Sequence, residues 1–209
     1  MIIKIDIREK QLITLIPDIL KENNLENIHK VEIEAIDLGD VILYDENRKM
    51  KIIIERKKLS DLASSIRDGR YSEQSLRLHH LDHHNHNIYY LVEGNMKYYS
   101  PKYTKVTPKA LYSAMISLNY FKGFSVFRTF DIYETAEFIV RMVDKIERES
   151  KKSIPFYRNF KQVNSEENRE KEDNCNSDSI HNGNNINGKG NCISDSNINV
   201  RIRKYLRAL

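Results

Sequence analysis

The sequence predicts an α/β domain in which helices flank a mixed sheet, because strand and helix patterns alternate over residues 1–150. The strand segments alternate apolar with polar residues or form short apolar runs, whereas the helical segments repeat apolar residues every three to four positions. The predicted strands cover residues 2–7, 31–36, 39–44, 51–56, 88–93 and 125–129, and the predicted helices cover residues 10–23, 72–81, 108–120 and 132–150, with a short helix beginning at Asp61.

The first half of the domain is predicted from alternation and from a hairpin. Residues 31–36 alternate apolar with acidic residues, which is typical of a half-buried strand. Residues 39–44 and 51–56 are separated by a short polar turn and are predicted to pair as a hairpin. Ser60 can cap the helix that begins at Asp61, whose negative charge suits a helix N-terminus.

The second half is predicted from helix-start signals and from one compact apolar run. Ser72, followed by Glu73 and Gln74, indicates the beginning of a helix. Residues 88–93 form a short apolar segment that ends at a glycine, as strands often do. Pro108 is well placed at the first position of a helix, and the last predicted helix is long and amphipathic.

Composition narrows the class of protein. Hydrophobic residues make up 40% and charged residues 31%, as in ordinary soluble domains, and the net charge of +4 permits a nucleic-acid partner without requiring one. No apolar run is long enough to span a bilayer, and the N-terminus reaches Asp6 too early for a signal peptide. The two cysteines, Cys175 and Cys192, lie in a polar tail, so the folded part needs no disulfide and fits a reducing compartment.

The composition changes after about Phe160, where Asn, Ser, Asp and Gly become common. We therefore expect a folded domain over residues 1–158 and a disordered linker over residues 159–199, because such a segment buries too little apolar surface to offset its ordering entropy. Residues 200–209 form a short basic segment, either a frayed terminus or a helix that forms on a partner.

Three charged residues form the pattern with the clearest chemical meaning. Glu55 and Lys57 are two positions apart on a predicted strand, so both project from one face, and the hairpin brings Asp40 beside them. Two carboxylates with the Arg56 carbonyl offer the oxygen ligands that Mg²⁺ prefers, and a lysine beside them can stabilise charge on a reacting phosphate. The alternative is a strand that ends in solvated charges, and the residues alone leave the two interpretations evenly balanced.

Longer motifs resemble the XPF/Mus81 family of structure-specific endonucleases. Gly-Asp at 39–40 and IERKKLSDL at 54–62 are similar to the family signature, and IDIRE at 5–9 is similar to its first strand. SIRDGRYSEQSLRL at 65–78 and GFSVFRTFDIYETAEFI at 123–139 extend the resemblance, the latter to the Mus81 branch. The resemblance implies a restriction-endonuclease-like PD-(D/E)XK core and Mg²⁺- or Mn²⁺-dependent cutting of flap, fork or nicked-junction DNA in repair or recombination.

The resemblance also implies roles for individual residues. The implied catalytic residues are Asp40, Glu55, Arg56, Lys57 and Asp61. The implied metal site comprises Asp40, Glu55, Asp6 and Arg56. The implied DNA-contacting residues are Arg8, Lys58, Arg67, Arg70 and Gln74.

The expected partners are branched double-stranded DNA and a second subunit, in a homodimer or a heterodimer with a related chain, with residues 108–150 as a candidate face. The nucleus or another DNA-replication compartment is the expected location, and no membrane is expected. The helix-hairpin-helix module of most relatives has no counterpart in the Asn-rich tail, so we expect weak DNA binding without a partner. Two rival hypotheses are a catalytically weak DNA-binding scaffold and a sequence-specific restriction-type enzyme.

Two further clusters invite functional interpretations that we disfavour. The histidines at 79–87 include pairs four residues apart that can bind Zn²⁺ on a helix, but a polar helix end is the simpler reading. Several tyrosines suggest base stacking, but tyrosines in strands mostly serve packing, so we predict core positions for them. They are Tyr89, Tyr90, Tyr98, Tyr99 and Tyr103.

Overall fold

A computed structural model describes residues 1–150, 152–155 and 157. Residues Met1–Ile154 form one compact unit, and the fold is that of this unit. The predicted segments 159–199 and 200–209 lie outside the described residues. Within the described part of the chain, no helix combines the length and the apolar composition that crossing a bilayer requires.

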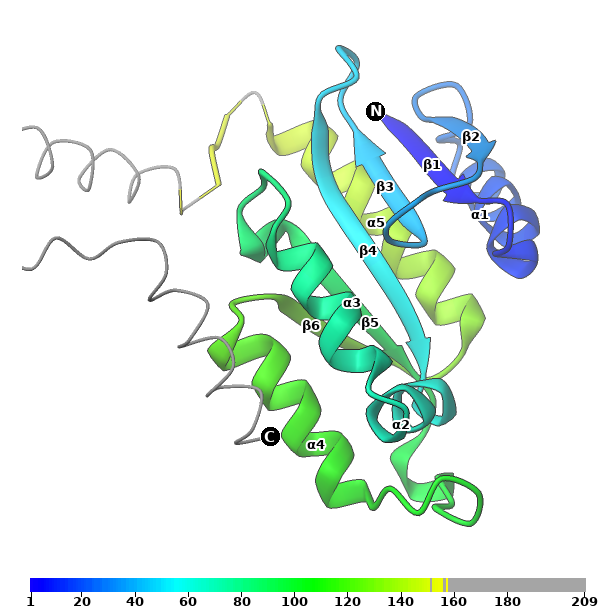
Figure 1. The fold of residues 1–209 in the computed structure, drawn as a ribbon. Helices are drawn as coiled ribbons and strands as arrows, with labels where there is room; N and C mark the ends of the chain where they lie inside the picture. Colours follow the sequence, from blue (N-terminus) through cyan, green and yellow to red (C-terminus); the bar gives the residue numbers. More distant parts are fainter. Residues whose placement is uncertain (151, 156, 158–209) are drawn as a thin grey trace, which may run out of the picture. The chain divides into compact units, whose positions relative to one another are not determined.

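Six strands form one mixed sheet, as predicted, in the order β2-β1-β3-β4-β5-β6 (Figure 1). The antiparallel pairs are β1 with β3 and β3 with β4, whereas β1–β2, β4–β5 and β5–β6 are parallel. The strands are β1 (Ile2–Asp6), β2 (Lys30–Glu34), β3 (Val41–Tyr44), β4 (Met50–Lys58), β5 (Ile88–Glu93) and β6 (Ser125–Thr129).

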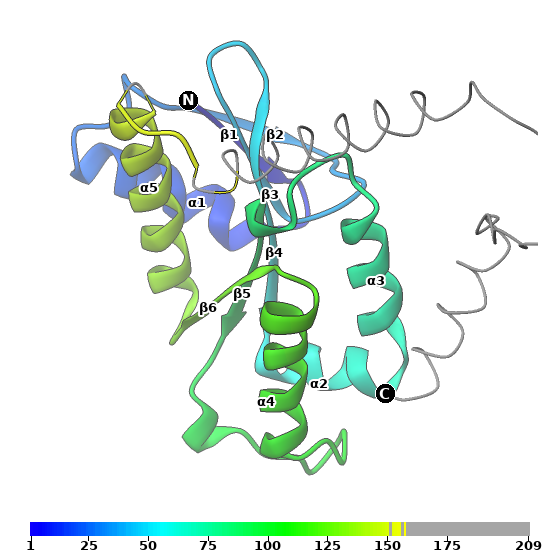
Figure 2. The same ribbon diagram turned by 90° about the vertical axis from the view of Figure 1, so that its left-hand side faces the viewer.

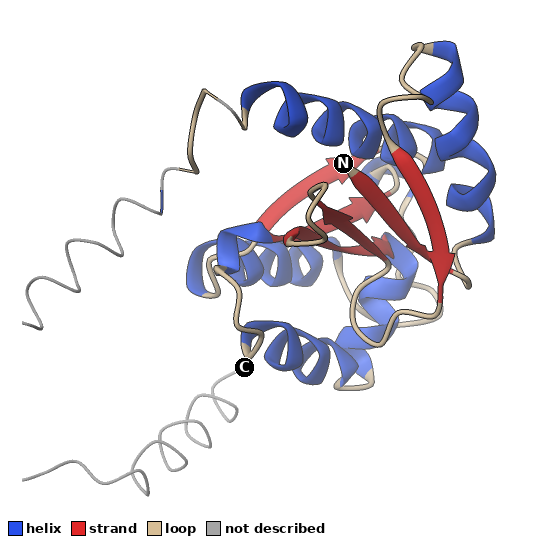
Figure 3. Ribbon diagram, turned by 90° about the horizontal axis from the view of Figure 1, so that it is seen from above, coloured by secondary structure: helices blue, strands red, loops and turns tan. Residues whose placement is uncertain are grey.

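Helices cover both faces of this sheet, which confirms the predicted α/β arrangement (Figures 2 and 3). One face is covered by α1 (Lys10–Glu22) and α5 (Ile132–Glu149). The other is covered by α2 (Leu59–Arg67), α3 (Arg70–His79) and α4 (Pro108–Ile116). Short turns of helix complete the chain: η1 (Asn85–Asn87), η2 (Met96–Tyr98) and η3 (Ser117–Phe121), the last of which is a π-helical turn.

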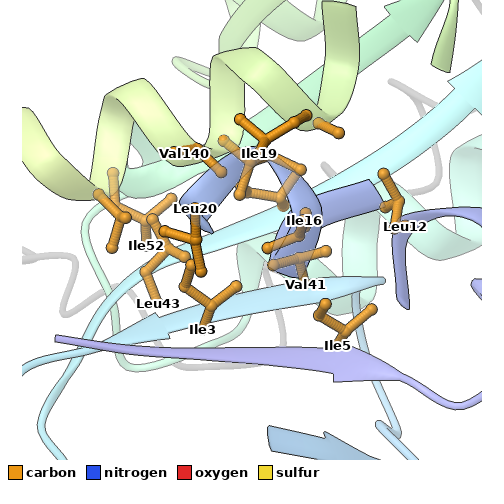
Figure 4. Packing of buried hydrophobic residues seen from close by; sticks show 14 of the residues in the cluster. Ile3, Ile5, Leu12, Ile16, Ile19, Leu20, Val41, Leu43, Ile52 and Val140 are labelled. Carbon is orange, nitrogen blue, oxygen red and sulfur yellow. The ribbon is translucent and has the colours of Figure 1, made fainter. Parts of the chain in front are cut away.

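Strand β4 lies inside the core and carries apolar residues toward both layers. Ile52 and Ile54 are buried against the layer of α1 and α5, where Figure 4 shows side chains from the sheet and both helices meeting. Ile53 is buried in the opposite layer, because successive strand residues alternate between faces. The charged residues that follow in β4 therefore emerge at the end of a buried strand.

Several predicted helix boundaries are wrong. Helix α2 begins at Leu59, two residues before Asp61, and Ser60 contacts the Asp61 carboxylate (3.2 Å) instead of capping the helix. The helix predicted to reach Tyr120 is α-helical only through Ile116 and continues as the π-turn η3. Both errors come from local propensity, which does not detect how neighbouring elements constrain a helix end.

The histidine pairs four residues apart do not lie on one helix in the structure. Helix α3 begins at Arg70 rather than Ser72 and ends at His79, so His80, His83 and His84 lie in the turn that follows and His86 lies in η1. The Nε2 atom of His83 lies 3.0 Å from the Lys51 carbonyl oxygen, within hydrogen-bonding distance. Residues four apart share a helical face only while the helix continues, so the premise of the zinc hypothesis is removed.

The prediction that the tyrosines lie in the core is correct for some and wrong for others. Tyr90 on β5 is 1% exposed and stacks on Phe124. Tyr98 and Tyr103, in contrast, are 78% and 82% exposed, because they lie in the connection between β5 and α4 and not in a strand. Core packing therefore does not explain these two exposed rings.

Candidate active site

Asp40 immediately precedes β3 and is held beside β4 by hydrogen bonds. Its backbone N–H donates to the Ile54 carbonyl (2.8 Å), and its own carbonyl accepts from the Asp6 N–H (2.9 Å). Its Oδ2 atom accepts from the backbone N–H of Arg56 at 2.7 Å. The carboxylate therefore takes the place of a missing strand partner, which holds it against the part of β4 that carries Glu55.

Gly39 allows this close approach. Its φ of +85° lies in the left-handed region that favours glycine. A Cβ atom at this position would lie 2.7 Å from Cγ1 of Ile53 and 3.2 Å from the Ile54 carbonyl oxygen. Only glycine lets the chain pass so near to β4, which explains why Gly precedes Asp in this motif.

Glu55, Lys57 and Gln74 form a triangle of hydrogen bonds. The Lys57 ammonium donates to Glu55 Oε1 (2.8 Å) and to Gln74 Oε1 (2.5 Å). The Gln74 amide N–H donates to the same Glu55 oxygen at 2.5 Å. The other oxygen of Glu55, Oε2, is buried and has no hydrogen-bond partner among the described residues. Gln74 of α3 thus orients both strand residues and leaves one carboxylate oxygen available.

These residues line a cavity of about 560 Å³. The residues predicted from the sequence that line it are Asp40, Glu55, Arg56, Lys57, Asp61, Arg70 and Gln74. Those that we did not predict as site residues are Ser64, Ser65, Glu73 and Arg77, from α2 and α3. The polar faces of these two amphipathic helices were the only sign in the sequence that their residues could line a site. Helical periodicity does not show which polar face borders a cavity.

Two carboxylates face each other in this cavity at an electrostatic cost. Burial, followed by the neighbouring charge of Glu55, raises the pKa of Asp40 to about 7. A cation between the two groups would remove this cost. Among the described residues no group of three or more His, Cys, Asp or Glu side chains is placed to hold a metal. A pair of carboxylates with one unpartnered oxygen fits Mg²⁺, which usually takes only one or two protein carboxylates.

Comparison with known protein families identifies the domain. A family model described as the ERCC4 domain matches residues 5–142. The chain belongs to the ERCC4 domain family. This result confirms the resemblance drawn from the motifs and, with the sheet described above, the restriction-endonuclease-like fold.

Curated relatives with this domain are much longer proteins. The chain is 32% identical over 157 residues to a probable crossover junction endonuclease mus81 of Dictyostelium discoideum, an alignment that covers 67% of this chain and 17% of the relative. It is 36% identical over 96 residues to the structure-specific endonuclease subunit MUS81 of Rattus norvegicus, covering 46% and 16% respectively. The chain therefore spans about one sixth of the length of these relatives.

Solved structures of similar fold also belong to XPF proteins. XPF from Aeropyrum pernix matches with a TM-score of 0.52 at 28% identity, covering 72% of this chain and 68% of that one. XPF from the same organism in complex with DNA matches with a TM-score of 0.52 at 27% identity, covering 73% of this chain and 68% of that one. The sheet and its helices are thus those of an XPF-type ERCC4 domain.

Arg56 of the ERCC4 signature presents its backbone and its side chain to different faces of the sheet. Its guanidinium donates to both oxygens of Glu93 (2.9 and 3.0 Å) and to Glu9 (3.0 Å), on the face shared with Ile54 and Leu91. Its backbone N–H meanwhile binds Asp40. The side chain is therefore an anchor behind the cavity, and only the backbone is placed for the predicted role at the metal. Neither Glu9 nor Glu93 was predicted as a partner.

Asp6 lies next to the cavity but does not line it. Both of its oxygens accept hydrogen bonds, from the guanidinium (2.6 and 3.0 Å) and backbone of Arg8 and from the N–H of Ile36. These bonds, led by the Arg8 side chain, lower the pKa of Asp6 to about 2. The Asp6 side chain is thus engaged within the protein and does not line the cavity, while its backbone N–H donates to the Asp40 carbonyl.

The other predicted DNA-contacting residues differ in their surroundings. Lys58, at the end of β4, is exposed. Arg67 pairs with Asp68 at 2.8 Å, and Arg70 pairs with the same carboxylate at 3.1 Å while also lining the cavity. Of these three residues only Arg70 lines the cavity, whereas Gln74, another predicted contact, is hydrogen-bonded directly to Glu55 and Lys57.

The pKa of Asp40 predicts how stability changes with pH. The folded state raises this pKa from 3.8 to about 7, so the folded protein retains a proton that the unfolded chain has released. The stability contributed by Asp40 is fully present below pH 3.8 and is lost as the pH rises through 7. In EDTA, Asp40→Asn should therefore stabilise the protein relative to wild type more at pH 8 than at pH 4, as measured by urea unfolding. An equal difference at both values would contradict the raised pKa.

Proposed function

We propose that the chain is a metal-dependent endonuclease domain that hydrolyses phosphodiester bonds in branched DNA during repair or recombination. The observation that carries this proposal is the convergence of Asp40, Glu55 and Lys57 in one cavity at the end of a buried strand. The names of the relatives support it, since these are crossover junction and structure-specific endonucleases, and XPF has been solved with DNA.

In the proposed mechanism, Asp40, Glu55 Oε2 and the Arg56 carbonyl would hold Mg²⁺ or Mn²⁺. When bound, such an ion supplies an acidified water and a polarised phosphoryl oxygen. Lys57 is held by Glu55 and Gln74, so its positive charge is already in place where negative charge grows on the phosphate. The mouth of the cavity can retain the DNA backbone through phosphate contacts that do not depend on sequence.

Cleavage of end-labelled 3′-flap, fork, nicked-junction and linear DNA tests this function. With Mg²⁺ or Mn²⁺ the chain should cut one strand near the branch, leaving a 5′-phosphate and a 3′-hydroxyl, and EDTA should stop the reaction. Binding without cutting would favour a DNA-binding scaffold. Discrete bands from an unbranched plasmid would favour a sequence-specific restriction-type enzyme.

A second subunit is part of the proposal, because α4 and η3 expose a row of apolar side chains. Tyr112, Ile116 and Tyr120 are four residues apart and share one helical face, and Phe121 adjoins them. Contiguous exposed apolar surface commonly marks a protein interface. We infer that this face pairs with another ERCC4 domain, in a homodimer or a heterodimer. Sedimentation should show a smaller species for the double variant Ile116→Asp/Tyr120→Asp than for wild type.

A further inference from the structure

The connection between β5 and α4 begins a long stretch without acidic residues. No Asp or Glu occurs from Gly94 to Phe130, whereas six basic residues do. They are Lys97, Lys102, Lys105, Lys109, Lys122 and Arg128. The first four lie in or directly after the connection, and all four are exposed. These exposed lysines add positive charge to this part of the surface, and such charge attracts a polyanion.

Two exposed tyrosines are interleaved with these lysines. Tyr98 follows Lys97, and Tyr103 lies between Lys102 and Lys105, with rings that are 78% and 82% exposed. The Lys102 ammonium lies 5.6 Å from the centre of the Tyr103 ring. Large aromatic rings contribute most when they are covered, so two nearly fully exposed rings among lysines indicate a surface that a flat, charged ligand can cover.

The connection has a defined shape. The hydroxyl of Tyr99 lies 3.0 Å from Oγ1 of Thr104 and donates to the Val106 carbonyl at 2.8 Å, which closes the loop on itself. The N–H of Lys105 donates to the Pro101 carbonyl (2.8 Å) across the tip. We call residues 95–106 the tyrosine–lysine loop. Because Tyr99 anchors the loop, the backbone that carries Tyr98 and Tyr103 is already ordered. Binding through these two rings therefore costs little additional backbone entropy.

The loop is tied to a helix that borders the catalytic cavity. The Arg67 guanidinium donates to the Tyr103 carbonyl at 3.3 Å, which joins the loop tip to the end of α2. The same helix contributes Asp61 and Ser64 to the cavity wall. In Figure 1 the connection between β5 and α4 lies below α2, beyond the ends of β4 and β5. A strand leaving the cavity along α2 would meet the exposed rings.

We propose that the tyrosine–lysine loop binds unpaired DNA, with bases stacked on Tyr98 and Tyr103 and phosphates contacted by Lys97, Lys102 and Lys105. This inference rests on the proposed nuclease function, because it assigns the loop to the single strand at a branch. Bases stack on protein aromatics only when they are unpaired, whereas a duplex offers mainly its phosphates. The two rings therefore select single strands, and the lysines add affinity that does not depend on sequence.

A tryptophan reporter can detect such stacking directly, because the chain contains no tryptophan. The full-length Tyr103→Trp variant is titrated in EDTA with oligothymidylate and with a duplex of equal length. Stacking should quench the tryptophan fluorescence with the single strand but not with the duplex. Absence of quenching at concentrations where the oligothymidylate is bound would overturn the proposal.

Binding by anisotropy then separates stacking from charge. Tyr98→Ala/Tyr103→Ala should weaken single-strand binding at least about tenfold and duplex binding much less, on the scale known for base stacking. Tyr98→Phe/Tyr103→Phe should bind like wild type, because the rings remain. Lys102→Gln/Lys105→Gln should reduce the slope of log affinity against log salt by about 1.4, and the distant control Lys49→Gln should not.

The outcomes distinguish this inference from the nuclease proposal. Unchanged single-strand binding by the alanine double variant, or failure of wild type to bind single strands at low salt, overturns the loop assignment even if flap DNA is cut. Loop-dependent binding without any cleavage supports the loop while the nuclease proposal fails. Tighter loop-dependent binding of oligouridylate than of oligothymidylate would replace DNA by RNA as the ligand and overturn the proposal as stated. Circular dichroism of each variant checks that it is folded.

Discussion

Replacing Lys57 by Ala should reduce DNA cleavage at least about a hundredfold, the scale seen when one preorganised electrostatic group is removed. Glu55 and Gln74 position the Lys57 ammonium before substrate binds. Its loss removes this charge stabilisation, and alanine offers no contact that could replace it. Asp40→Asn should cause a loss of similar size. The amide can still accept the Arg56 N–H bond, so this variant tests the charge rather than the strand geometry. Single-turnover cleavage at saturating DNA measures both effects.

Lys49→Ala is the matched control for these variants. Lys49 is exposed in the hairpin between β3 and β4, at the other end of the strands from the cavity, and its removal should leave the cleavage rate unchanged. Retention of more than a tenth of the wild-type rate by Lys57→Ala would contradict its assigned role. Unaltered Mn²⁺ binding by Asp40→Asn in the absence of DNA would contradict the role of Asp40 as a ligand.

Replacing Arg56 by Met should cost about 3–5 kcal/mol of unfolding free energy, because removing one partner of a buried ion pair leaves an uncompensated charge. The Arg56 side chain is 10% exposed and that of Glu93 is 7% exposed, and Glu9 also depends on the same guanidinium. Two carboxylates would then remain near each other without a cation. Urea unfolding at pH 7, extrapolated to water, measures the loss.

The surface pair of Arg48 and Glu32 provides the comparison. The Arg48 side chain is 59% exposed, so Arg48→Met should cost much less stability than Arg56→Met. Adding Glu93→Gln to Arg56→Met should recover part of the stability, because the second change removes one unpaired charge. A loss below about 1 kcal/mol for Arg56→Met would show that the network behind the cavity contributes little.

Much of the fold can be predicted because its signals are local. The bounds of β5 and β6 agree with the apolar runs at residues 88–93 and 125–129, and the mixed sheet follows from alternating elements. The meeting of Asp40, Glu55 and Lys57 also follows from local features, namely a hairpin and a two-residue spacing on one strand. Short sequence separations left few alternatives for these side chains.

The parts that could not be predicted depend on long-range contacts. Arg56 meets Glu93 and Glu9 across 37 and 47 residues, and no periodic pattern encodes such a pairing. The hydrogen bond from the Ile36 N–H to the Asp6 carboxylate depends on the path of the chain after β2. The composition of that segment does not specify its path. The exposure of Tyr98 and Tyr103 was missed because residue type indicates burial only when the residue lies in a regular element.

The unequal lengths of β3 and β4 have an architectural consequence. Pairing between them starts at Val41 and Ile54, yet β4 continues to Lys58 with only β5 alongside. This leaves a notch in the sheet, and the candidate site occupies the room that a longer β3 would have filled. Two extra sheet residues before Val41 would therefore close the notch, whereas lengthening the distant hairpin at Asp45–Lys49 would leave it open. The room available to the candidate site thus depends on where β3 begins.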